Sequence, residues 1–168
     1  MMSDSTARIE IFDSFRKGML SYFSLPPIGK DIAFRKGAVS HRIASSIEKA
    51  FPPSLAVDIE ILGTDILVRN GEEPVLALFW SSTYLTEKER SKALEFHRQY
   101  RPSLTLAFSM LEEKDYLLIY RFESDYVDYL HIDKTDFSEM LLKRCMIGRS
   151  EDGQLMLDVM RRKRVRKA

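Results

Sequence analysis

The sequence contains a single cysteine, Cys145, which excludes an internal disulfide and a zinc site built on several cysteines. It has no apolar run near the roughly 18 residues that span a bilayer, so we expect no membrane segment. The first ten residues lack a charged stretch followed by an apolar one, so we expect no signal peptide. Only 7 glycines occur, and no GxxxxGK[ST], GxGxxG or GxSxG motif is present. These absences predict a cytoplasmic globular protein without a phosphate-cradling loop or a nucleophile elbow.

No large excess of charge of either sign is present, because 26 Lys and Arg stand against 25 Asp and Glu. The distribution is nevertheless uneven. Six basic residues lie in the last eight positions, and without them residues 1–160 have a net charge of about −5. A basic arm on an acidic body is typical of proteins that bind nucleic acid or an acidic partner, and a solvated C-terminal tail is the alternative.

Hydrophobic periodicity predicts one α/β domain over residues 1–160, followed by a basic tail at 161–168. Helices are expected where apolar residues recur at three- and four-residue spacing, at 13–23, 40–51, 86–100 and 135–145. Strands are expected where apolar residues alternate with polar ones or run continuously, at 55–62, 66–68, 75–80, 104–110, 116–122 and 129–132. Asn70–Gly71 is a strong hairpin signal. Residues 155–159 form a short element of either type.

Residues 40–110 are expected to form a helix, a strand, the hairpin segment TDILVRNGEEPVLALFWSS, a second helix and a strand with the sequence PSLTLAFSM. This outline resembles the core of the PD-(D/E)XK superfamily, which has the restriction-endonuclease-like fold. In that family an Asp opens the second strand, a hairpin follows, and the third strand ends in Glu-x-Lys and small residues. Asp65 matches the Asp, and Ser81–Ser82 match the small residues. The resemblance implies a restriction-endonuclease-like three-layer α/β core with a central mixed sheet flanked by helices.

The sequence departs from the family at the residues that carry the chemistry. Leu78 stands at the carboxylate position and Trp80 at the lysine position. Cleavage needs carboxylates to hold Mg²⁺ and a cation to stabilise developing charge, which leucine and tryptophan do not supply. A two-residue turn at Asn70–Gly71 would pair Asp65 with Leu76, on an apolar face. We therefore expect a protein without cofactor or catalysis that acts by binding nucleic acid or a protein partner.

A migrated metal site is the first alternative. Glu48 lies in the helix before the strands, where some members of the family carry a third carboxylate. A two-residue turn at Gly63–Thr64 would make Glu60 and Asp65 diagonal neighbours, within reach of one Mg²⁺. This alternative is a Mg²⁺-dependent nuclease with catalytic Glu48, Glu60 and Asp65, in which Glu60 and Asp65 hold the metal. Otherwise Asp58 and Glu60 line the solvent face of an outer strand.

Basic residues near the second helix and at the C-terminus are the candidate contacts to nucleic-acid phosphates. They are Arg35, Lys36, Arg42, Arg161, Arg162, Lys163 and Arg164. A solvated helix face is the alternative for the first three.

A second alternative is an interaction protein that homodimerises through an exposed sheet edge or an aromatic surface. Tyr116 and Tyr120 would share one strand face, where they could stack bases or pack in the core. The three histidines show no metal-ligand spacing. Of these, we expect His97 to lie nearest the site, because its helix borders the site in this fold.

Overall fold

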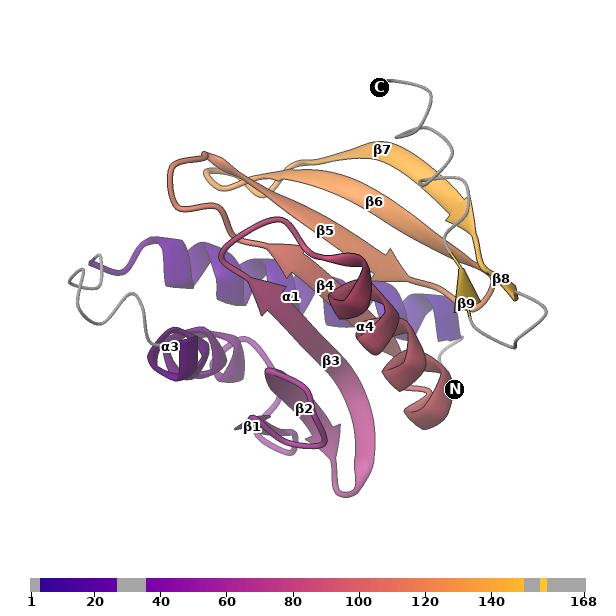
Figure 1. The fold of residues 1–168 in the computed structure, drawn as a ribbon. Coiled ribbons are helices and arrows are strands. Elements are labelled where there is room, and N and C mark those ends of the chain that lie inside the picture. Colours follow the sequence, from indigo (N-terminus) through magenta and orange to yellow (C-terminus); the bar gives the residue numbers. More distant parts are fainter. Residues whose placement is uncertain (1–3, 27–35, 150–154, 157–168) are drawn as a thin grey trace.

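The computed structural model describes residues 4–26, 36–149 and 155–156, and it has a seven-stranded mixed sheet flanked by helices on both faces (Figure 1). The helices are α1 (Asp4–Phe23), α3 (Lys36–Glu48) and α4 (Glu87–Tyr100). The strands of the sheet are β1 (Ala56–Ile59), β2 (Ile66–Asn70), β3 (Glu73–Ser81), β4 (Leu104–Ser109), β5 (Tyr116–Phe122), β6 (Tyr126–Asp133) and β7 (Glu139–Met146). Two short strands, β8 (Gly148–Arg149) and β9 (Leu155–Met156), form a separate pair. Among the described residues, no helix is long and apolar enough to cross a membrane.

The seven strands lie side by side in chain order, and every neighbouring pair is antiparallel except β3 and β4. A parallel pair requires a crossover, and α4 supplies it. Thr86 and Glu89 form a capping box that fixes where α4 begins. At the other end Arg101 adopts a left-handed conformation and its N–H donates to the His97 carbonyl.

Two apolar cores lie on opposite faces of the sheet. On one face, α1 and α3 pack against alternate residues of the central strands. Phe15 of α1 is fully buried there, and its ring contacts the rings of Phe108 and Phe137. On the other face α4 covers a second core. The helices α1 and α3 approach closely, because a Cβ at Gly18 would lie 2.7 Å from the Cα of Ile47.

The expected α/β class is confirmed, but the helix expected at 135–145 is wrong: β7 occupies most of this segment. The chain turns sharply after β6, where the Asp133 carboxylate accepts hydrogen bonds from the backbone N–H groups of Thr135 and Asp136. Phe137 follows with a positive φ of 58° and is fully buried in the core beneath α1. Because Phe137 is buried at this turn, the chain returns alongside β6. Residues 139–146 therefore pair with β6 as a strand instead of forming the helix that local composition favours.

The expected β2–β3 register is also wrong. Asn70 pairs with Glu73, so Gly71 and Glu72 form the turn, and Val68 pairs with Leu76. The register shifts because β3 has one extra residue near Pro74, which has no N–H to donate to the ladder. Asp65 consequently lies beside Leu78 and Trp80 rather than opposite Leu76.

Candidate functional site

The Asp65 carboxylate is held by two groups. Its Oδ2 atom accepts a 2.8 Å hydrogen bond from the backbone N–H of Trp80. Its Oδ1 atom lies 3.0 Å from the ammonium of Lys36, at the start of α3. The backbone N–H of Asp65 donates to the carbonyl of Leu78 and extends the β2–β3 ladder to this residue. Both carboxylate oxygens are therefore engaged within the protein.

The Trp80 side chain is buried beside α3. It is only 4% exposed, and its Nε1–H donates a 2.8 Å hydrogen bond to Oγ of Ser40 in α3. The Lys36 ammonium lies 5.2 Å from the centre of the indole ring, within the range of a cation–π contact. One lysine therefore contacts both Asp65 and Trp80, and these contacts link the start of α3 to β3.

The second carboxylate of the expected metal site lies nearby, but the third does not. Glu60 Oε1 lies 3.3 Å from the position that a Cβ on Gly37 would take, beside the first turn of α3. Glu48 is the last residue of α3, about 18 Å from Lys36 along the helix axis. The structure brings Glu60 and Asp65 to the same end of α3 and leaves Glu48 at the other end. Within the described ranges, no three or more His, Cys, Asp or Glu side chains are grouped to hold a metal ion.

The turn between β1 and β2 differs from the expected two-residue turn at Gly63–Thr64. The backbone N–H of Glu60 donates to the carbonyl of Asp65, so the turn contains residues 61–64. Asp58, within β1, forms an ion pair with Arg69, 2.8 Å between Oδ2 and Nε. Asp58 and Glu60 therefore have separate surroundings.

Two of the candidate phosphate contacts lie in the described part of the chain. The Lys36 side chain is half exposed, although its ammonium is paired with Asp65. Arg42, one and a half turns later in α3, donates to the carbonyl of Pro26. The other candidates lie outside the described residues: Arg35, Arg161, Arg162, Lys163 and Arg164.

His97 does not border the Asp65 site, contrary to expectation. It occupies the last turn of α4, and its Nδ1 lies 2.7 Å from Oγ1 of Thr105. Thr105 pairs with Ala77, three residues along β3 from Trp80, which corresponds to about 10 Å along the strand. The pKa of His97 is lowered to about 4, mainly by burial and also by the nearby Arg8 charge, while a hydrogen bond to the Glu123 backbone opposes both effects. His97 is therefore neutral near pH 7.

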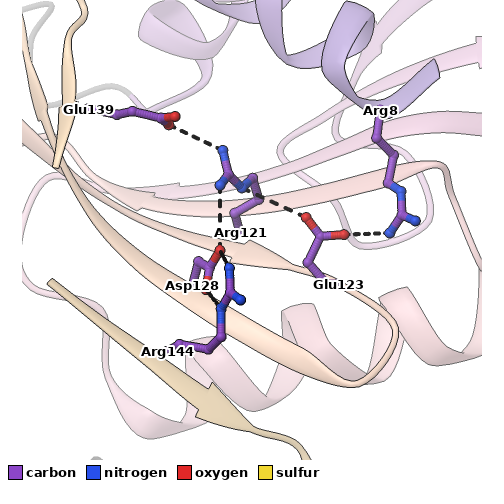
Figure 2. A network of polar contacts seen from close by, with 6 residues as sticks. All are labelled: Arg8, Arg121, Glu123, Asp128, Glu139 and Arg144. Atoms are coloured by element: carbon purple, nitrogen blue, oxygen red, sulfur yellow. Dashed lines mark hydrogen bonds and ion pairs between the residues drawn. The ribbon is translucent and has the colours of Figure 1, made fainter. Parts of the chain in front are cut away.

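A charged network that the sequence did not reveal crosses β5, β6 and β7 and reaches α1 (Figure 2). At its centre the Asp128 side chain, 2% exposed, accepts hydrogen bonds of 2.7 and 3.0 Å from Arg144 and lies 3.5 Å from Arg121. Arg8 of α1 forms an ion pair with Glu123, which also lies near Arg121. The register brings these residues together across three strands, and their contacts fasten α1 to the sheet.

Among the described strands, β7 forms one edge of the seven-stranded sheet (Figure 1). It carries several exposed large apolar side chains. Leu141 and Leu142, within the segment expected to be a helix, are 51% and 46% exposed, and Met140 and Met146 are 55% and 61% exposed. An edge strand presents backbone N–H and C=O groups that can pair with a further strand. This edge is therefore a candidate contact surface.

Comparison with family models, with curated proteins and with solved structures gave no match.

Proposed function

We propose that this chain is a restriction-endonuclease-like domain that binds nucleic acid and does not cleave it. The element order supports the fold assignment, since α3, three antiparallel strands, α4 and a strand parallel to β3 follow one another as the resemblance implies. Asp65 lies at the start of the second of these strands and next to the end of the third. This is where the family carries its metal-binding Asp.

The proposed loss of cleavage is supported mainly by the ion pair between Lys36 and Asp65, which neutralises the carboxylate. The ammonium of Lys36 occupies the side of the carboxylate where a cation would bind, and the Trp80 N–H takes the other oxygen. Leu78 is fully buried and has no ligand atom. A divalent ion would have to displace Lys36 and would gain only one carboxylate from the aligned motif, whereas Mg²⁺ sites combine several oxygen ligands.

Binding to nucleic acid is supported by the positions of the basic residues. Lys36 and Arg42 lie in α3, Lys36 beside Asp65, and six basic residues lie at 161–168 in the sequence. Cations near a phosphate chain gain affinity by releasing condensed counterions, and the gain decreases as salt increases. The domain would therefore hold nucleic acid through its backbone, with a strong dependence on salt.

The cleavage test uses plasmid and single-stranded DNA with Mg²⁺ or Mn²⁺. We expect no cleavage above the level of a matched Asp65→Ala preparation, since Asp65 is engaged by Lys36. Asp58→Ala serves as the control, because it removes a β1 carboxylate that pairs with Arg69. Cleavage that is lost in Asp65→Ala and kept in Asp58→Ala would overturn the proposal and restore the nuclease reading with Glu60 and Asp65.

The binding test measures the fluorescence anisotropy of labelled DNA and RNA over a range of salt concentrations. Each phosphate contact contributes about 0.9 to the slope of log affinity against log salt. We expect a chain ending at residue 160 to lose part of this slope, and Lys36→Gln/Arg42→Gln to reduce it by up to about 2. Lys88→Gln is the control, because Lys88 is exposed and lies in α4 rather than α3. Affinity that is absent, or that does not change with salt, would refute nucleic-acid binding.

The exposed β7 edge favours a second candidate function, homodimerisation. Two β7 strands could pair at the edge that β7 forms among the described strands, and this would cover the exposed side chains of Leu141 and Leu142. We expect a dimer by light scattering, which Leu141→Lys/Leu142→Lys converts to a monomer. Ile9→Lys is the matched control, because Ile9 is 63% exposed on α1. A strict monomer, or equal dissociation by the control, would remove this candidate.

A further inference from the structure

A cavity of about 850 Å³ lies at the opposite end of the strands from Asp65. Its walls come from the start of α1, the last turn of α4 with the residues that follow it, the β5–β6 turn and the end of β7. This volume falls within the range of small-molecule sites, roughly 300–1,000 Å³. Among the described residues singled out in the sequence, His97 lines the cavity, whereas Lys36 and Arg42 do not.

The polar side of the cavity is basic. Arg8, Arg98 and Arg101 line it, and Asp125 is the only lining residue with a carboxylate among those described. Arg8 is paired with Glu123. Among the described residues, neither Arg98 nor Arg101 takes part in an ion pair. Two guanidinium groups therefore remain for an anion.

The positive charge of Arg98 and Arg101 exceeds the amount that would offset the dipole at the C-terminus of α4. A helix C-terminus carries roughly half a negative charge, which one cation in the last turn offsets. Arg98 lies in that turn, and Arg101 adds a second cation just beyond it. Arg101 also has a left-handed backbone with φ of 47°, a conformation that glycine adopts more readily at this position. Such conformations in other residues are concentrated at functional sites.

The apolar lining of the cavity adjoins the basic one. Leu94 lies about one turn before Arg98 in α4, Pro102 follows Arg101, and both are buried. Ile147 packs at the margin of the core beneath α4. The β5–β6 turn, which also lines the cavity, is closed by a hydrogen bond from the Glu123 N–H to the Tyr126 carbonyl, and its tip presents Ser124 and Asp125. A ligand that fits has an anionic group for Arg98 and Arg101, an apolar body beside it, and hydroxyl groups that can reach Ser124 and Asp125.

We propose that this cavity binds a nucleoside monophosphate. Arg98 and Arg101 hold the phosphate, because a guanidinium donates two parallel hydrogen bonds to phosphate oxygens. The base lies against Leu94 and Pro102, and the Asp125 carboxylate accepts hydrogen bonds from the ribose hydroxyls. His97, neutral near pH 7 and committed to Thr105, forms part of the wall rather than a phosphate contact.

Isothermal titration calorimetry of the full chain tests this with the four common nucleoside monophosphates, the matching nucleosides and inorganic phosphate. At least one monophosphate should bind about tenfold or more tightly than its nucleoside and than phosphate. Arg98→Gln and Arg101→Gln should each weaken this binding about tenfold, because each removes a charged contact. Lys88→Gln, which removes an exposed charge at the other end of α4, should leave it unchanged.

Both arginines are exposed, so their variants should fold, and circular dichroism checks this. In the unmodified chain, the backbone amide NMR signals of Ser103 and Ser124 should shift on titration, which reports the cavity without any substitution. Absence of monophosphate binding would overturn the proposal. Equal affinity for inorganic phosphate, an equal effect of Lys88→Gln, or binding of oligonucleotides alone would also overturn it. The salt dependence attributed to Lys36, Arg42 and the tail is measured separately, so either proposal can fail alone.

Discussion

Substitutions at Asp65 should show whether its carboxylate stabilises the fold or is kept for binding a metal ion. Loss of a structural carboxylate lowers the free energy of unfolding, whereas loss of a metal ligand leaves it unchanged or raises it in the absence of metal. Asp65→Ala leaves the N–H of Trp80 without its acceptor, in a strand whose side chains are buried at this point. An unsatisfied buried donor costs about 1–3 kcal/mol. The lost pair with half-exposed Lys36 adds up to about 1 kcal/mol. We expect the free energy of unfolding to fall by about 2–3 kcal/mol.

Two further variants divide this total between its causes. Asp65→Asn keeps an oxygen that can accept from Trp80 and loses the ion pair, so it should cost about 1 kcal/mol or less. Lys36→Met also loses the ion pair, together with the cation–π contact to the indole, and should cost about 1 kcal/mol. The chain has a single tryptophan, so urea unfolding followed by Trp80 fluorescence reports this region directly.

The opposite sign would refute the reasoning. Carboxylates kept for metal binding are often costly to stability, and their removal without the metal is neutral or stabilising. If Asp65→Ala raised the free energy of unfolding in the absence of divalent ions, Asp65 would not be a structural residue. Asp58→Ala is the control, with an expected loss below about 1 kcal/mol, since its partner Arg69 is about one-third exposed.

Three further predictions concern stability. The folded-state pKa of His97 is about 4, below the unfolded value near 6.5, so the unfolded chain binds the proton first as pH falls. Its contribution of about 3 kcal/mol is present above pH 6.5 and is lost between about pH 6.5 and 4, and urea titrations should show a smaller loss in His97→Gln. Phe15→Ala should cost about 3–5 kcal/mol by urea unfolding, against almost nothing for exposed Ile9→Ala. Gly18→Ala should lower the melting temperature, although alanine favours helices, because its Cβ would meet the Ile47 backbone; an increase would contradict the close approach of α1 and α3.

The parts of the fold that were predicted from sequence are those in which local pattern and burial agree. Leu104 and its neighbours form an apolar run that becomes a central strand, and Thr86 with Glu89 marks the beginning of α4 through a capping box. The prediction was wrong at 135–145, because helix-forming residues there pair with β6 once Phe137 enters the core. An edge strand with two exposed leucines lacks the apolar alternation that identifies a half-buried strand.

The candidate site shows the same division. The sequence drew attention to Asp65, Leu78 and Trp80, because these depend only on residue type at positions along one hairpin. It did not identify Lys36 as the partner of Asp65, since that contact joins residues 29 positions apart through the packing of α3 on the sheet. The shift of register near Pro74 likewise changed the neighbours of Asp65.

The sequence by itself determined the α/β class, most of the central strands and the crossover helix. These follow from periodicity, capping and residue identity, which act over a few neighbouring positions. Only the tertiary structure decided that a lysine neutralises Asp65, that β7 lies at an edge of the described sheet, and that Arg8 of α1 lines the same cavity as Arg98 and Arg101. Each of these depends on which distant segments pack together, and that choice is set by burial of the whole core rather than by local preference.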